Sequence, residues 1–275
     1  MRVALIQLRS TRDVDANLAT CHRLAEQAAE TGARWILFPE NAPFLGKDED
    51  KIPLAETIDG AQIDFFRQMA RSFDAWITVG SFAEKSPDPD RTYNTQVHLS
   101  PQGDTAATYR KIHLFDVAVD EAVNFCESDS VYPGDEVVDT TVSTRNEQKH
   151  SVGLSICYDL RFPELYRNLQ RKGVEAITVP SAFTLSTGQA HWHALLRARA
   201  IENQAYVLAP NQWGHHFGTR KSYGNSTIYD PWGQCIACAS DRETFIVADL
   251  DFEYLHEIRR AMPVLSHRTL EDPPR

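Results

Sequence analysis

The chain has 275 residues, of which 42% are hydrophobic and 24% charged, values typical of a globular protein that can bury a substantial core. Its formal net charge of -10, with no block of Lys or Arg, argues against a nucleic acid or a membrane surface as partner. The apolar runs are too short to span a bilayer, and residues 1–8 lack a signal-peptide layout. Five cysteines without framework spacing favour a reducing compartment, so we expect a cytoplasmic protein.

The N-terminal part predicts a strand–helix–strand unit, a second helix and a hairpin. In chain order the expected elements are a strand at Val3–Leu8, a helix capped by Asp13 or Asp15 and ending at Gly32, a strand at Trp35–Phe38, a helix at Gln62–Phe73, a strand at Trp76–Phe82, and a hairpin of Tyr93–Leu99 with Thr105–Leu114. Because a helix connects the first two strands, these should run parallel. Phe115–Ser130 has no clear periodicity of apolar residues and is expected to form a long irregular loop.

The C-terminal part predicts a second strand–helix–strand unit and then a meander. The expected elements are a hairpin of Val137–Val142 with Ser151–Ile156, a helix at Pro163–Lys172, a strand at Glu175–Pro180, a helix at Ser186–Gln204, a strand at Tyr206–Pro210, a loop at Trp213–Gly224, meander strands at Asn225–Tyr229, Gln234–Ala239 and Phe245–Asp249, and a short helix at Glu253–Met262. No linker divides the chain, so one α/β domain with mixed sheets is expected.

Cys235 and Cys238 have the spacing of a redox or zinc motif, but they lie in a segment that favours a strand. Residues three apart on a strand point to opposite faces, which argues against a shared site. We therefore predict no metal site and no cofactor, and no nucleotide or flavin motif is present in the sequence.

Cys157 ends the apolar run Val152–Ile156, and Pro163 suits the first turn of a following helix. A cysteine on such a strand-to-helix turn is held out of the sheet beside backbone N–H groups, a geometry that serves a nucleophile. The alternative is that Cys157 is a small buried apolar side chain, as free cysteines usually are.

Three charged residues could complete such a site. Glu40 follows a strand at the sheet edge where ligands bind, although a surface or capping role is the alternative. Lys111 lies late in a strand, and Glu127 lies in the long loop. A thiol that attacks an amide needs a base and a donor for the oxyanion, and a neighbouring lysine would also lower the pKa of the thiol.

With these residues in view, the sequence resembles the nitrilase superfamily of carbon–nitrogen hydrolases. The motifs that carry the resemblance are Phe38-Pro39-Glu40, Tyr109-Arg110-Lys111-Ile112-His113-Leu114 and Gly153-Leu154-Ser155-Ile156-Cys157-Tyr158-Asp159-Leu160-Arg161, in this order. The resemblance implies Cys157 as nucleophile, Glu40 as general base, Lys111 as stabiliser of the oxyanion, Glu127 as a second glutamate near the lysine, and the N–H of Tyr158 as second oxyanion donor. It also implies a four-layer αββα sandwich that forms a homodimer through a helix layer.

Within the superfamily the sequence is more similar to the branch that holds deaminated glutathione amidase and omega-amidase. This implies hydrolysis of a small, carboxylate-bearing 2-oxo acid amide through a thioester; an N-carbamoyl or aliphatic amide, and a non-catalytic interaction module, are the alternatives. Arg161 is a candidate for the substrate carboxylate, with an ion pair to Glu164 or another acid as the alternative. Arg220 and Lys221 could bind a second carboxylate, with a solvated loop as the alternative. Further candidates for substrate binding are Phe183 and Thr184.

The whole of residues 1–271 is expected to form the hydrolase domain. Residues 263–275 have little apolar content and are expected to form a tail, or an arm that contacts a partner subunit.

Overall fold

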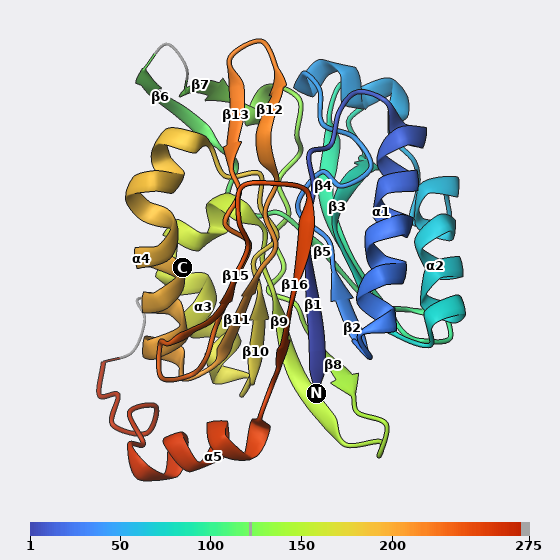
Figure 1. Cartoon of the computed structure of the whole chain (residues 1–275). Coiled ribbons are helices and arrows are strands. Elements are labelled where there is room, and N and C mark those ends of the chain that lie inside the picture. The colour runs from blue at the N-terminus through green and yellow to red at the C-terminus, as the bar shows by residue number, and fades with distance from the viewer. Residues whose placement is uncertain (121–122, 271–275) are drawn as a thin grey trace.

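The computed structural model describes residues 1–120 and 123–270, and it consists of two six-stranded sheets that pack face to face (Figure 1). In spatial order the first sheet contains β16 (Thr244–Asp249), β1 (Arg2–Gln7), β2 (Trp35–Leu37), β3 (Trp76–Lys85), β4 (Thr92–Leu99) and β5 (Thr105–Arg110). The second contains β15 (Cys235–Cys238), β14 (Thr227–Tyr229), β11 (Tyr206–Ala209), β10 (Ala176–Thr178), β9 (Lys149–Leu154) and β8 (Asp139–Ser143).

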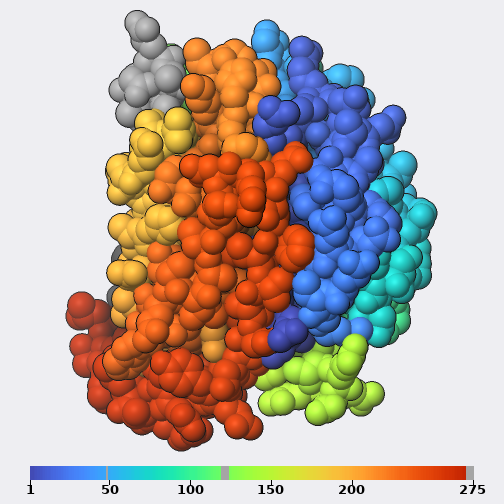
Figure 2. Space-filling model, in the orientation of Figure 1, coloured from blue at the N-terminus to red at the C-terminus, as the bar shows by residue number. Residues whose placement is uncertain are grey.

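Helices cover the outer face of each sheet. Helices α1 (Val14–Glu30) and α2 (Ala61–Phe73) pack on the first sheet, and α3 (Pro163–Arg171) and α4 (Leu185–Asn203) cover the second (Figure 1). This arrangement confirms the predicted four-layer αββα sandwich. Helix α5 (Phe252–Ala261) lies at the lower end of the face in Figure 2, opposite the β12–β13 hairpin described below.

Successive side chains of β1 alternate between the two packing surfaces of the first sheet, which shows how the layers are built. Val3 and Leu5 belong to the core between the sheets, whereas Ala4 and Ile6 pack with the apolar faces of α1 and α2. Successive side chains of a strand point to opposite faces, so a strand covered on both sides must be apolar throughout. This explains the unbroken apolar run at the N-terminus.

Both predicted strand–helix–strand units are confirmed, since β1, β2 and β3 are parallel in one sheet and β9, β10 and β11 are parallel in the other. An isolated bridge between Leu8 and Gln212 links the segments that follow β1 and β11. The carboxyl ends of the two parallel sets therefore meet, and the segments that follow them surround one region of the sandwich.

Three segments differ from the prediction. The expected loop at Phe115–Ser130 contains a hairpin of β6 (Asp116–Asp120) and β7 (Val123–Cys126), and the expected loop at Trp213–Gly224 contains a hairpin of β12 (Trp213–Phe217) and β13 (Arg220–Tyr223). Both are two-stranded, so their pairing is local and neither adds to the main sheets. The expected meander is also wrong, because β16 leaves the second sheet and pairs antiparallel with β1.

The prediction that Cys235 and Cys238 point to opposite faces is wrong as well. A β-bulge in β15 places Cys235 opposite Tyr229 and Cys238 opposite Thr227. Because residues 227 and 229 share a face of β14, their two partners do so too. Among the described residues there is still no group of three or more His, Cys, Asp or Glu side chains that could hold a metal ion.

In the described part of the chain, no helix is both long and apolar enough to cross a membrane. The last five residues of the expected tail, 271–275, lie outside the described residues. The domain boundary, the contact of the tail with a partner subunit, the homodimer and the cytoplasmic location stay predictions.

Gly80 in β3 packs directly against the backbone of Phe38 and Pro39, the two residues before Glu40. A Cβ atom at residue 80 would lie 2.1 Å from the carbonyl oxygen of Phe38 and 2.4 Å from that of Pro39. We expect Gly80→Ala to destabilise the fold by about 3 kcal/mol or more in urea denaturation, because backbone atoms cannot yield as a flexible side chain can. Gly173→Ala is the control, since it meets open space at φ +80° and should cost only about 1–2 kcal/mol of backbone strain. Equal losses for the two variants would contradict the close approach.

Candidate active site

Cys157 lies three residues beyond the end of β9, at the start of a single 3-10 turn, η3 (Cys157–Arg161). Its backbone has φ +49°, a left-handed conformation that is costly for a residue other than glycine. The Cys157 N–H donates to the carbonyl oxygen of Pro180 at 3.0 Å, which ties the turn to the end of β10. The predicted strand-to-helix turn is thus present, and strain is stored at the residue proposed as nucleophile.

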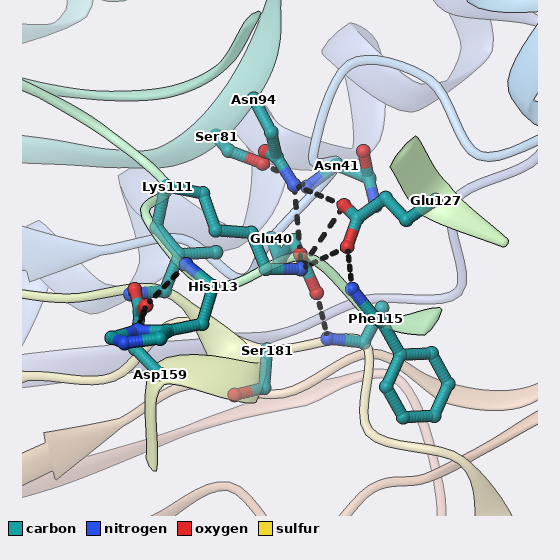
Figure 3. A network of polar contacts seen from close by, with 12 residues as sticks. Glu40, Asn41, Ser81, Asn94, Lys111, His113, Phe115, Glu127, Asp159 and Ser181 are labelled. Atoms are coloured by element: carbon teal, nitrogen blue, oxygen red, sulfur yellow. Dashed lines mark hydrogen bonds and ion pairs between the residues drawn. The ribbon is translucent and has the colours of Figure 1, made fainter. Parts of the chain in front are cut away.

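Asp159 holds this turn in place. Its buried carboxylate accepts hydrogen bonds from the Ile156 N–H at 2.9 Å and from the Tyr109 hydroxyl at 2.7 Å. It also accepts from the His113 N–H at 3.1 Å, and the His113 ring nitrogen Nδ1 lies 2.7 Å away (Figure 3). Tyr109 and His113 flank Lys111, so Asp159 connects the lysine segment directly to the cysteine turn.

Lys111 lies just beyond the end of β5, with its side chain 2% exposed between two carboxylates. Its Nζ donates to Glu40 Oε1 at 3.0 Å and to Glu127 Oε1 and Oε2 at 3.0 and 2.8 Å (Figure 3). Glu127 begins η2 (Glu127–Asp129) and also accepts from the Phe115 N–H at 2.7 Å. Three segments that are distant in the sequence therefore converge on one ammonium group.

Two partners of this network were missed by the sequence analysis. Asn94 Nδ2 donates to Glu40 Oε1 at 2.9 Å and to Glu127 Oε1 at 3.2 Å, and the Ala182 N–H donates to Glu40 Oε2 at 2.7 Å. The only signal for Asn94 was a polar residue in the middle of a strand, Thr92–Leu99, that is otherwise buried. Glu40 and Cys157 line the same cavity and are close enough to shift the pKa of one another, so Glu40 lies near both the cation and the sulfur.

These side chains open into a single cavity. It is lined by Glu40, Asn41, Leu45, Gly46, Lys51, Lys111, Phe115, Phe125, Glu127, Cys157, Tyr158, Ala182, Phe183, Thr184, Thr187, Phe217 and Arg220. Of the residues proposed from the sequence, Arg161 and Lys221 are not in this lining. For Arg161 the structure shows other contacts. Its guanidinium lies over the rings of Tyr158 and Phe183, 5.7 and 5.3 Å from their centroids, and Nη1 is 3.3 Å from His191 Nδ1. Arg161 therefore packs against the cavity wall and does not pair with Glu164.

Burial and charge determine the protonation of the site. Burial raises the pKa of the Cys157 thiol and the Glu40 carboxylate raises it further, which outweighs the opposite effect of Lys111. The expectation that Lys111 would lower the pKa of the thiol is therefore wrong in sum. Burial alone would raise the pKa of Glu40, but Lys111 and the Cys157 thiol bring it below its ordinary value of 4.5.

Burial alone would lower the pKa of Lys111, but Glu127 and Glu40 raise it well above its ordinary value of 10.5. At neutral pH the site thus holds a neutral thiol, an ionised Glu40 and a charged Lys111. This distribution suits a base that removes the thiol proton during attack, and it does not suit a thiolate that exists beforehand.

We expect kcat/KM of the enzyme to be level between about pH 5 and pH 8. Glu40 must be ionised to act as a base, and because its pKa is lowered, the active form is lost only as the pH falls below 4.5. A pH–rate profile on an amide substrate, restricted to pH values at which circular dichroism shows a folded protein, tests this. A rise centred near pH 8.5, the ordinary thiol value, would instead indicate simple ionisation of Cys157.

Asn94→Asp is expected to move the acidic limb of that profile upward by about one pH unit or more, because a third carboxylate disfavours ionisation of Glu40. The matched control is Asn146→Asp in the exposed turn between β8 and β9, which should leave the limb unchanged. An Asn94→Asp profile identical to the parent would show that Asn94 does not share the electrostatics of Glu40.

Comparison with known proteins gives the family. The carbon-nitrogen hydrolase family matches residues 2–260. The human protein named deaminated glutathione amidase is 42% identical over 97% of this chain and 81% of that protein, and the protein of the same name from Synechocystis is 39% identical over 96% of this chain and 97% of that protein.

Solved structures agree with this result. The Caenorhabditis elegans NitFhit protein has a TM-score of 0.89 at 38% identity, covering 97% of this chain and 64% of that one. Saccharomyces cerevisiae Nit3, described as a member of branch 10 of the nitrilase superfamily, has a TM-score of 0.84 at 32% identity, covering 96% of this chain and 94% of that one. The chain belongs to the carbon-nitrogen hydrolase family and is a hydrolase of the nitrilase superfamily.

Proposed function

We propose that the protein is a cysteine-dependent amidase that cleaves the amide of a 2-oxo acid through a thioester, with deaminated glutathione as its substrate. The observation that carries the mechanism is that Glu40, Lys111 and Cys157 line one cavity. There Glu40 accepts a hydrogen bond from Lys111 Nζ at 3.0 Å and lies close enough to the thiol to shift its pKa. The substrate is suggested by the name that the human and Synechocystis relatives share.

In the first half-reaction, Glu40 takes the proton of the Cys157 thiol while the sulfur attacks the amide carbon. The carbonyl oxygen becomes an oxyanion, which Lys111 Nζ and the N–H of Tyr158 stabilise. The N–H of Tyr158 is available for this because the first N–H groups of a helical turn have no partner within it. Glu40 then gives its proton to the nitrogen, the C–N bond breaks, and a free amine or ammonia leaves a thioester on Cys157.

In the second half-reaction, Glu40 removes a proton from water, and the hydroxyl oxygen attacks the thioester carbon. The same donors stabilise the second oxyanion. The C–S bond breaks, the sulfur recovers its proton from Glu40, and the carboxylic acid is released. Glu127 stays bound to Lys111 throughout and keeps its Nζ oriented, so Glu127 is a positioning residue in this scheme.

The cavity suits an acyl group that bears a carboxylate. Apart from Lys111, the buried Lys51 and the half-buried Arg220 line it, and its aromatic residues supply apolar contacts for a short carbon chain. Two cations and an apolar wall match the carboxylate and methylene groups of a 2-oxo dicarboxylic monoamide.

The rival substrates differ in the group that leaves. Omega-amidase chemistry on 2-oxoglutaramate releases ammonia, and deaminated glutathione releases a dipeptide amine. An N-carbamoyl amino acid releases the free amino acid together with ammonia and carbon dioxide. A panel of these three and a simple aliphatic amide, with amine and ammonia release measured separately, distinguishes them. We expect the highest kcat/KM on deaminated glutathione. Turnover of none of the four would favour a non-catalytic interaction module.

Cys157→Ala is expected to abolish amide hydrolysis and to keep the fold, because the Glu40–Lys111–Glu127 contacts do not need the sulfur. Cys126→Ala is the matched control, since this exposed thiol does not line the cavity and should retain full activity. Mass spectrometry of the parent enzyme after rapid quenching should show one acyl group added at Cys157. Full activity of a folded Cys157→Ala variant would disprove the mechanism.

A further inference from the structure

A second groove adjoins the active-site cavity. It lies between the first turn of α4 and the β12–β13 hairpin, which are neighbours in Figure 2, where α4 begins in yellow and the hairpin is orange. Its lining consists of Thr184, Leu185, Ser186, Gln189, His215, Gly218, Thr219, Arg220 and Lys221. Thr184 and Arg220 line both the groove and the cavity, so the two spaces share a wall.

One short segment of the chain connects the groove to the catalytic base. Glu40, which gives the amine its proton in the proposed mechanism, accepts from the Ala182 N–H at 2.7 Å. The carbonyl oxygen of the same residue accepts from Arg220 Nη2 at 3.2 Å, and the Arg220 guanidinium lies 4.4 Å from the centroid of the Phe125 ring. The segment from Ala182 to Thr184 thus runs from the base to the groove.

The hairpin is fastened to this segment. The Tyr223 N–H donates to the carbonyl oxygen of Phe183 at 2.9 Å, and Thr184 forms an isolated antiparallel bridge with Ser222. His216 lies 3.0 Å from Ser222 Oγ and 2.8 Å from the carbonyl oxygen of Ser10. The strand that carries Arg220 and Lys221 is therefore held against the start of α4.

The charge of the groove is opposite to that of the chain. The formal net charge of the protein is -10, yet the groove lining contains Arg220 and Lys221 and no acidic residue. The start of α4 adds the positive end of its helix dipole, and its first turn has no acidic residue to offset it. Leu185, which is 37% exposed, supplies an apolar surface beside these cations.

We propose that this groove binds the leaving amine of the substrate, and that it selects an amine of dipeptide length that ends in a carboxylate. Lys221, which lines the groove and not the cavity, attracts this carboxylate, whereas Arg220 is left to the carboxylate of the acyl group. Leu185 contacts the side chain that precedes the terminal carboxylate. Ammonia has no group that could reach the groove. The inference rests on the proposed function, since it assigns the leaving-group side of the same site.

The kinetic test compares two amides with the same 2-oxo acyl group, one that releases ammonia and one that releases a dipeptide ending in a carboxylate. Lys221→Glu should raise KM for the dipeptidyl amide about tenfold and change neither kinetic constant of the primary amide more than about twofold. The matched control is Lys149→Glu, an exposed lysine at the start of β9 that does not line the groove. A dipeptidyl amide whose terminal carboxylate is blocked as an amide should be insensitive to Lys221→Glu.

A binding experiment separates failure of this inference from failure of the proposed function. Titration calorimetry of the dipeptidyl amide into Cys157→Ala measures the Kd of the amide without hydrolysis. Lys221→Glu in that background should weaken binding about tenfold. If the parent enzyme hydrolyses neither amide but this difference persists, the proposed function is wrong and the groove assignment stands. Equal effects of Lys221→Glu on both amides, or no effect on binding, would overturn the assignment.

Discussion

The contact between Lys111 and the carboxylates of Glu40 and Glu127 is the interaction on which the site depends. All three side chains are nearly excluded from solvent, and a buried charge without a partner costs several kcal/mol. Each residue comes from a different part of the chain: the end of β2, the end of β5 and the turn after the β6–β7 hairpin. The buried charges can be compensated only when all three segments are in place. The site therefore has its correct geometry only when the three segments are docked correctly.

Asp159 and Ala182 connect the three charged residues to the second sheet. Asp159 accepts hydrogen bonds from both sides of Lys111 and from the residue before Cys157, so the cation and the sulfur cannot move independently. The N–H of Ala182, beyond the end of β10, holds the second oxygen of Glu40. The active site is thus assembled across the interface of the two sheets, where the carboxyl ends of both parallel sets meet.

Burial has a chemical consequence besides stability. The same exclusion of water that strengthens the ion pairs raises the pKa of Cys157, so a thiolate does not form until a base accepts its proton. Glu40 is held ionised by Lys111 and lines the same cavity as the thiol, which makes it the candidate for that base. A neutral thiol at rest is also a poor target for oxidants, because reactivity follows the thiolate form.

Local sequence signals were enough to predict the two strand–helix–strand units, the turn that presents Cys157, and the residues that its motifs share with the carbon–nitrogen hydrolases. Hydrophobic periodicity, capping residues and the order of motifs can all be read from short stretches of the chain. Three features became visible only in the folded protein: β16 pairs with β1, a bulge turns Cys235 and Cys238 to one face, and Arg161 lies behind the cavity wall. The folded structure also shows Asn94 and Asp159 as hydrogen-bond partners of the site residues. In it the pKa of Cys157 is raised, whereas a lowered pKa was expected. Each of these depends on which distant groups come into contact and how much water they exclude, and no local pattern encodes that.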